Sequence, residues 1–248
     1  MNIYQQIVQK KSEGLKQFAI LVDPDKVTND QIEQVCRLAS DCSVDYIFVG
    51  GSLLTNGSMS NCIRRIKYAC NIPVVLFPGN TNQVDGQADA LLFLSLISGR
   101  NADLLIGKHV TSAPIIREKK LEAIPTGYML IESGNTTTAL YMSNTHPIPH
   151  DKPDIASCTA MAGEMLGLKM IFMDAGSGAH IPVSEEMIRM VRKSVQIPLI
   201  VGGGINSPEK AAINCKAGAD IIVVGNSIEK NHSVISEIAE AIKKSVAV

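Results

Sequence analysis

The sequence predicts an α/β protein built as a single (β/α)8 TIM barrel, and three observations lead to that prediction. Apolar runs typical of buried parallel strands alternate with helical patterns along the chain. The segment 197–226 reads as strand, glycine turn, helix, strand and glycine turn, which is a βαβ unit. The length of 248 residues suits one barrel, because such barrels have about 250 residues. We therefore expect one domain over residues 1–248.

Eight apolar runs are the expected strands of this barrel. They are rich in β-branched and large aliphatic residues, and each has the length of a strand rather than of a helix. In chain order they cover residues 18–22, 46–49, 74–77, 90–94, 128–131, 170–173, 199–201 and 221–224. No shorter internal repeat is visible.

Capping signals mark helices between these strands. Thr28 and Gln31 have the spacing of a capping box, and Ser207 precedes Pro208 at the start of another helix. The segment 134–153 is polar and interrupted by prolines, so we expect a loop there. It forms a lid or a wall of a substrate site, or else it is an ordinary surface excursion.

The composition argues against several classes of function. A net charge of −1 without a basic run, together with the absence of tryptophan, argues against a nucleic-acid partner. The six cysteines have no CxxC or zinc-ribbon spacing, which is typical of reduced thiols. The longest apolar run, residues 90–97, is too short to cross a bilayer, which takes about 20 residues. We expect a soluble, cytoplasmic protein, and transient contact with a membrane surface stays open.

Glycine turns follow the last expected strands. Gly203 and Gly204 follow the seventh strand, and Gly225 follows the eighth. Glycine lets backbone N–H groups approach a ligand closely, and the helix that starts after Ser207 adds the positive end of its dipole. In a (β/α)8 barrel the loops after strands seven and eight often form a phosphate site. The sequence therefore predicts a phosphate-binding site at the C-terminal ends of strands 6 to 8.

Polar side chains at three strand ends are the candidates for chemistry. Asp23 and Ser52 follow the first two strands and offer oxygen ligands to Mg²⁺, although Asp23 can also be a turn acid before Pro24. Asp174 ends the sixth strand beside a Gly-Ser-Gly turn, where a carboxylate can accept a hydroxyl proton. The alternative for Asp174 is a turn-forming acid.

Six short motifs occur in an order and spacing that resemble one protein family. They are LVDPDK at 21–26, VGGS at 49–52, SGRN at 98–101, FMDAGSGA at 172–179, VGGGI at 201–205 and VGN at 224–226. Over nearly the whole chain these motifs resemble the geranylgeranylglyceryl phosphate synthase family. The sequence is more similar to its archaeal and Bacteroidetes-type branch than to the related heptaprenylglyceryl phosphate synthases.

The resemblance implies a Mg²⁺-dependent barrel prenyltransferase. Its substrates would be sn-glycerol 1-phosphate and a polyprenyl diphosphate such as geranylgeranyl diphosphate, joined by an ether bond at the 3-hydroxyl with release of diphosphate. By motif, Mg²⁺ is assigned to Asp23 and Ser52, and the role of base to Asp174. The glycerol phosphate is assigned to Phe172, Met173, Asp174, Ala175, Gly176, Ser177, Gly178, Gly203, Gly204, Gly225 and Asn226. The resemblance also implies a homo-oligomer, with a hexamer favoured.

The apolar tail of such a donor needs a groove. Leu92, Leu94, Leu96 and Ile97, together with Tyr128, are candidates for its wall. Ordinary barrel core is the alternative for at least half of them.

Two residues depart from family patterns. Asp174 stands where family members commonly have Glu, which shortens the reach of the acid by one methylene, and Leu21 replaces a Lys of the heptaprenyl branch. Two other functions stay open at this point. One is a barrel isomerase or lyase that acts on a sugar phosphate and has no tail groove. The other is a non-catalytic phosphate-ligand sensor, in which Asp23 and Asp174 would be dispensable.

Overall fold

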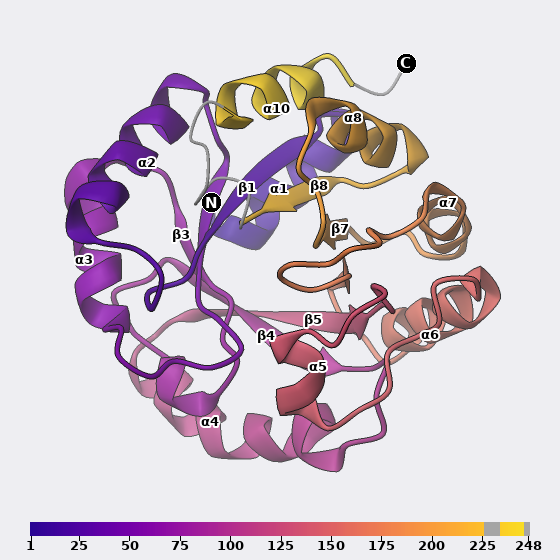
Figure 1. Ribbon diagram of the computed structural model, residues 1–248. Helices are drawn as coiled ribbons and strands as arrows, with labels where there is room; N and C mark the ends of the chain where they lie inside the picture. The colour runs from indigo at the N-terminus through magenta and orange to yellow at the C-terminus, as the bar shows by residue number, and fades with distance from the viewer. Residues whose placement is uncertain (226–233, 246–248) are drawn as a thin grey trace.

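Eight parallel strands close into a barrel, and helices form a ring around it (Figure 1). This computed structural model describes residues 1–225 and 234–245. The strands are β1 (Gln17–Val22), β2 (Tyr46–Val49), β3 (Val74–Leu76), β4 (Ala90–Leu96), β5 (Glu122–Leu130), β6 (Met170–Asp174), β7 (Leu199–Gly202) and β8 (Ile221–Val224). Consecutive strands are neighbours, and β8 closes onto β1 with Val224 opposite Ile20. The predicted (β/α)8 fold is confirmed.

The helices alternate with the strands for most of the chain. They are α1 (Ile3–Ser12), α2 (Asn29–Asp41), α3 (Met59–Ala69), α4 (Lys108–Glu118), α5 (Thr138–Ser143), α6 (Pro153–Met165), α7 (Glu185–Ser194), α8 (Pro208–Ala217) and α10 (Val234–Lys243). The predicted caps are present: Thr28 and Gln31 form a capping box, and the Ser207 hydroxyl accepts from the N–H of Lys210. None of the described helices is both long and apolar enough to cross a membrane.

Successive strand residues point to opposite sides of the barrel wall, which gives two apolar cores. Tyr46 and Phe48 of β2 belong to the core inside the barrel, whereas Ile47 and Val49 pack in the core between strands and helices. Both sides of β2 are buried, and this explains why the strand reads as a continuous apolar run.

One sector of the ring lacks a full helix. Between β3 and β4 the chain forms only a single 3₁₀ turn, η1 (Thr81–Gln83). After β4 it forms a π-helical segment, η2 (Asp103–Gly107), which leads into α4. The outer side of the barrel is therefore less covered beside β3 and β4 than elsewhere.

Two elements differ from the expected ones. β5 begins at Glu122, six residues before the predicted start at Tyr128, and pairs with β4 from Ala90 onward. Pro125 lies inside this extension, and a proline without an N–H normally argues against a strand. The segment 134–153 also contains the short helix α5, whose Thr137 hydroxyl caps it at Leu140.

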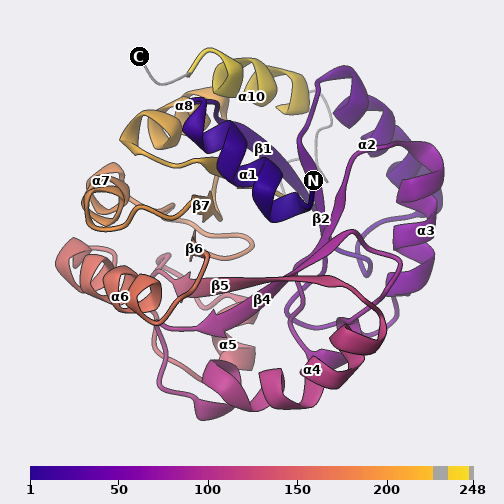
Figure 2. The same cartoon turned by 180° about the vertical axis from the view of Figure 1, so that it is seen from behind.

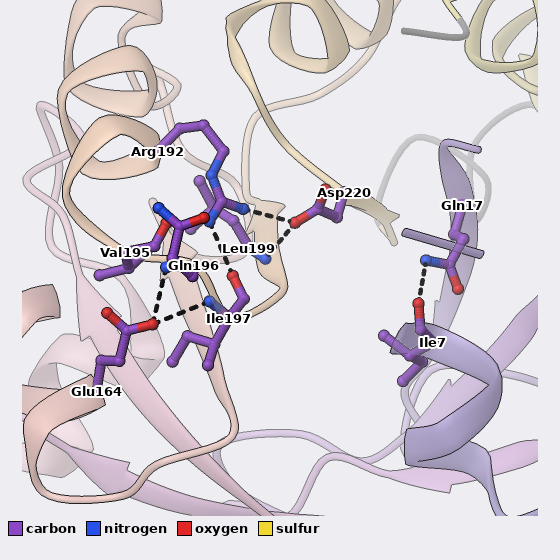
Figure 3. Close-up of polar contacts among 9 residues, drawn as sticks. All are labelled: Ile7, Gln17, Glu164, Arg192, Val195, Gln196, Ile197, Leu199 and Asp220. Atoms are coloured by element: carbon purple, nitrogen blue, oxygen red, sulfur yellow. Dashed lines mark hydrogen bonds and ion pairs between the residues drawn. The ribbon is translucent and has the colours of Figure 1, made fainter. Parts of the chain in front are cut away.

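Helix α1 crosses the N-terminal end of the barrel, where Figure 2 shows it in front of the strands. Ile7 of α1 belongs to the inner core, and its carbonyl accepts from Nε2 of the buried Gln17 at 3.3 Å (Figure 3). The Glu122 carboxylate accepts from the N–H groups of Ile3 and Tyr4 at 2.7 and 3.0 Å. An anion at this helix start is favourable, so α1 is held across the opening.

Three aspartates that directly precede strands, here called the strand-start acids, also close this end. They are Asp45, Asp89 and Asp220. Each accepts the N–H of the first or second residue of a neighbouring strand: Phe18 at 2.7 Å, Val74 at 2.8 Å and Leu199 at 2.8 Å, respectively. Each also pairs with a cation, namely Lys10, Lys67 and Arg192. Figure 3 shows the Arg192 case, in which the guanidinium also donates to the carbonyls of Val195 and Ile197.

Candidate active site

A cavity of about 750 Å³ opens at the C-terminal end of the barrel. Its wall includes Leu21 from β1, Phe172 and Asp174 from β6, and Val223 from β8. The loops that follow β1, β2, β6 and β7 complete it. Because parallel strands all end at this face, side chains far apart in sequence meet here.

The turns after β6 and β7 meet at Gly203. This glycine has a φ of +82°, and a Cβ built on it would lie 2.6 Å from the backbone nitrogen of Gly176. Gly204 has a φ of +69°. The N–H groups of Gly203, Gly204 and Gly225 have no acceptor among the residues that the structure describes. Donors that converge without acceptors, near the start of α8, are suited to hold an anion such as phosphate.

Asp174 lies beside this turn with 8% of its surface exposed. One carboxylate oxygen, Oδ2, accepts from the Tyr128 hydroxyl at 2.6 Å, and the other accepts from the N–H of Gly176 at 2.7 Å. Burial raises the pKa of Asp174, although both hydrogen bonds act in the opposite direction. No cation pairs with it within the described chain. A carboxylate with a raised pKa is a stronger base, which suits proton acceptance.

Asp23 and Ser52 line the same cavity from adjacent strand ends, with Val22 of β1 opposite Val49 of β2. The Asp23 carboxylate lies beside Gly51, where a built Cβ would be 3.2 Å away, and its Oδ2 is 3.2 Å from Lys26 Nζ. The Ser52 hydroxyl makes no hydrogen bond to any described residue.

These two oxygen donors fit the way that proteins hold Mg²⁺. Among the described residues there is no group of three or more His, Cys, Asp or Glu side chains that could hold a metal ion. Mg²⁺ does not need such a cage, because it is usually bound by one or two carboxylates together with substrate phosphates and water. Asp23 and Ser52 are placed to act in that way at the edge of the cavity.

Asp25, the second acid of the Asp-Pro-Asp motif, has a different role. Its carboxylate accepts from the N–H groups of Thr55, Asn56 and Gly57, and from the Thr55 hydroxyl at 2.9 Å. These backbone hydrogen bonds lower the pKa of Asp25 to about 2. Asp25 therefore fixes the loop between β2 and α3, which carries Ser52.

A second cavity, of about 190 Å³, continues from the first into the sector without a full helix. Its apolar lining comes mainly from β4, and the segments around η1 and α4 add both apolar and polar side chains. Leu92, Leu94, Leu96 and Tyr128 line it, as expected from the sequence for a tail groove. Ile97 does not; it faces a shallow hollow beside α6.

Comparison with known proteins finds relatives that match nearly the whole chain. The model of the PcrB family matches residues 6–244. The chain belongs to the PcrB family. It is 57% identical to a geranylgeranylglyceryl phosphate synthase of Chitinophaga pinensis over 97% of this chain and 95% of that protein. It is 42% identical to the synthase of the same name from Korarchaeum cryptofilum, over 90% and 91% of the two chains.

Solved structures of PcrB-like synthases have the same fold. The (S)-3-O-geranylgeranylglyceryl phosphate synthase of Thermoplasma acidophilum, solved with sn-glycerol 1-phosphate, superposes with a TM-score of 0.92 at 30% identity over 98% of this chain and 99% of that one. Barrels of other activities, such as the tryptophan synthase alpha chain of Legionella pneumophila, reach a TM-score of 0.60 at 12% identity and share the fold alone. The resemblance drawn from the six motifs is confirmed.

In this member of the PcrB family, the predicted site residues do not all reach the cavity. Phe172, Asp174, Gly176, Ser177, Gly178, Gly203, Gly204, Gly225, Asp23 and Ser52 line it. Met173 and Ala175 are buried in the core between strands and helices, so their side chains face away from it. Asn226 lies outside the described residues. Nothing in the sequence indicated that Tyr128 binds Asp174, since 46 residues separate them.

Proposed function

We propose that this protein joins the 3-hydroxyl of sn-glycerol 1-phosphate to C1 of a polyprenyl diphosphate, with release of diphosphate. The observation that carries this proposal is the junction of two cavities with different linings. The larger one contains three acids and the glycine turns suited to an anion, and the smaller one is lined along β4 by leucines. Family membership and a relative of the same fold solved with sn-glycerol 1-phosphate support the same acceptor here.

The acceptor phosphate would bind at the glycine turns after β6, β7 and β8. The N–H groups of Gly203, Gly204 and Gly225 would supply the donors. Fixing the phosphate there would bring the glycerol hydroxyls near Asp174, which lines the same cavity. An anchored acceptor needs little further ordering before it reacts.

The donor would lie along both cavities. Its hydrocarbon tail suits the cavity beside β4, because burying apolar surface against the leucines of that strand is favourable. Its diphosphate would then reach Ser52, which lines both cavities, and the neighbouring Asp23 and Lys26. Bound Mg²⁺ would offset negative charge on the departing diphosphate.

In the reaction, the bond between C1 and the diphosphate oxygen breaks and its electron pair leaves with diphosphate. The acceptor oxygen forms the new bond to C1, and its proton passes to Asp174. The hydrogen bonds from Tyr128 and Gly176 hold the carboxylate in place for this transfer. The cavity between the strand ends shields the electron-poor carbon from most of the solvent.

The apolar cavity also separates this function from the alternatives. A sugar-phosphate isomerase or lyase has no use for a second cavity lined by leucines that adjoins the phosphate site. A phosphate-ligand sensor would not need a buried acid without a cation beside that site.

Mixing the pure protein with sn-glycerol 1-phosphate, Mg²⁺ and prenyl diphosphates of several lengths tests the proposal. We expect an ether product by mass spectrometry, with one range of tail lengths preferred. Excess chelator and the Asp23→Ala variant should each abolish turnover while acceptor binding, measured by calorimetry, stays largely intact. Asp41→Ala, which removes an exposed acid at the far end of α2, serves as the matched control. Full activity in chelator would refute the Mg²⁺ requirement.

We also propose a homo-oligomer, with a hexamer favoured, and transient contact with a membrane surface. Three large apolar side chains on α6 or directly after it are exposed: Ile155 to 45%, Met165 to 85% and Leu166 to 80%. Such exposure is unusual for large apolar side chains and suits a subunit contact. Tyr141 and Met142 of α5 are 78% and 49% exposed near the apolar cavity. Light scattering at micromolar concentration and co-sedimentation with lipid vesicles test these two proposals.

A further inference from the structure

Three aromatic rings form a cluster at the C-terminal end of the barrel interior. Phe77, directly after β3, stacks on Phe172 of β6 with ring centroids 5.2 Å apart. Tyr128 of β5 meets both rings edge to face, at 5.6 Å from Phe77 and 5.5 Å from Phe172. Each ring therefore fixes the orientation of the other two.

Two of these rings stand where the two cavities meet. Phe77 and Tyr128 line both the polar and the apolar cavity, and both are only partly buried. Phe172 is 1% exposed, lines only the polar cavity and packs against both rings. The other residues shared by the two cavities are Gly51, Ser52, Leu53 and Ala139, none of which has an aromatic face.

This junction is also where the reacting carbon must lie. If the donor tail occupies the apolar cavity and the acceptor phosphate occupies the glycine turns, C1 of the donor lies between them. C1 of a prenyl diphosphate is allylic, so its bond to oxygen breaks readily and leaves positive charge shared between C1 and C3. A carboxylate next to that charge would capture it, whereas the face of an aromatic ring stabilises it without forming a bond.

We propose that Phe77 is a catalytic residue whose ring face stabilises the positive charge that develops on the allylic carbons of the donor. Tyr128 contributes in the same way, and its hydrogen bond to the Asp174 carboxylate makes its ring richer in electrons. The charge is thus met by rings on the donor side while Asp174 receives the proton on the acceptor side. This inference rests on the proposed prenyl transfer.

Fluorinated phenylalanines at position 77 test the inference. Mono-, di- and trifluorophenylalanine keep the shape of the ring but withdraw electrons from its face step by step. We expect the single-turnover rate to fall at each step, by about 2- to 30-fold across the series, with little change in KM for either substrate. The same series at Phe48, which is 1% exposed inside the barrel and lines neither cavity, should leave the rate unchanged.

The outcomes separate this inference from the proposed function. A rate that stays constant across the Phe77 series, or a loss confined to KM, would overturn the role of the ring while leaving prenyl transfer intact. A protein with ordinary Phe77 that makes no ether product would instead refute the proposed function. Because fluorination hardly changes the volume of the ring, each variant should fold, which thermal unfolding verifies.

Discussion

The acids at the two ends of this barrel have different partners, and each end has one acid that is buried, Asp220 at the N-terminal end and Asp174 at the C-terminal end. At the N-terminal end the strand-start acids Asp45, Asp89 and Asp220 each have a cation and a backbone N–H as partners. At the C-terminal end Asp174 is as buried as Asp220, at 8% against 6% exposed, but no described cation pairs with it. Its partners are a hydroxyl and one N–H.

An acid that is paired with a cation and one that is not have different roles, the first in stability and the second in function. A buried carboxylate with all its partners holds strands together, and its loss leaves an unpaired cation behind. A buried carboxylate without a cation costs stability when it is ionised, but it is the better base for that reason. The reactive acid therefore lies at the C-terminal end of the barrel, whereas the acids at the N-terminal end have hydrogen-bond and ion-pair partners. This arrangement is expected, because the active sites of such barrels lie at the C-terminal face.

Among the changes that test this contrast between the two ends, the largest effect should come from Asp174→Asn. This change keeps size and hydrogen bonding but removes proton acceptance, so we expect kcat to fall by about 10² to 10⁴ with little change in acceptor affinity. Steady-state kinetics and calorimetry measure the two quantities. Asp174→Glu should retain substantial activity, because Glu keeps a carboxylate that can accept the proton and lengthens its reach by only one methylene. An Asn variant within a few-fold of the parent would show that another group takes the proton.

Replacing Asp with Asn at the N-terminal end of the barrel should instead lower stability and leave activity nearly unchanged. Asp220→Asn leaves the guanidinium of Arg192 without its carboxylate in a largely buried place. We expect the free energy of unfolding to fall by about 3 kcal/mol while kcat of the folded protein stays within two-fold of the parent, about the level of ordinary variation. Urea titration and kinetics below the transition test this. If Asp220→Asn lowered kcat as much as Asp174→Asn, the division between the two ends would be wrong.

A smaller contrast lies within the C-terminal end, between two glycines of the proposed phosphate site. Gly203→Ala puts a Cβ 2.6 Å from a backbone nitrogen at a φ of +82°. Strain of about 1–3 kcal/mol at that turn should raise KM for the acceptor about 10- to 100-fold. Gly225→Ala would place a Cβ at an ordinary contact distance from Leu21, 3.4 Å from its Cβ, and should change KM by no more than a few-fold, about 0.5 kcal/mol. Equal changes of KM for the two variants would mean that the turn after β7 does not bind the acceptor.

Sequence patterns predicted the barrel and most of the cavity wall, because both depend on local features. Apolar runs mark strands buried on two sides, and a polar or glycine residue at a strand end must lie at the C-terminal face once the barrel closes. The contact between Tyr128 and Asp174 was not predictable in this way. It depends on the register between β5 and β6, in which Tyr128 stands opposite Phe172. The pairing of Asp220 with Arg192 and the loop contacts of Asp25 likewise need the closed fold.

The smallest expected effect is a change of stability and activity with pH. Both changes depend on the charge of one residue, Asp174. Burial raises the pKa of Asp174 above its ordinary value of 3.8, so the folded protein binds that proton more tightly than the unfolded chain does. The stability that this preference provides is complete below pH 3.8 and is lost as the pH rises through the raised pKa. The amide introduced by Asp174→Asn does not titrate, so this variant should gain in free energy of unfolding relative to the parent over that rise.

Activity should follow the opposite course over the same interval. The base must be ionised to accept a proton, so kcat/KM of the parent should increase with pH through the raised pKa of Asp174, just as the parent loses stability relative to the variant. Urea unfolding of both proteins and kcat/KM of the parent, measured from about pH 4 upward so that the rise through the raised pKa of Asp174 is covered, provide the comparison. Two results would contradict this prediction. One is that the free energies of unfolding of parent and variant change with pH in parallel, and the other is that kcat/KM of the parent does not fall at low pH. Either would mean that ionisation of Asp174 does not both lower stability and raise activity.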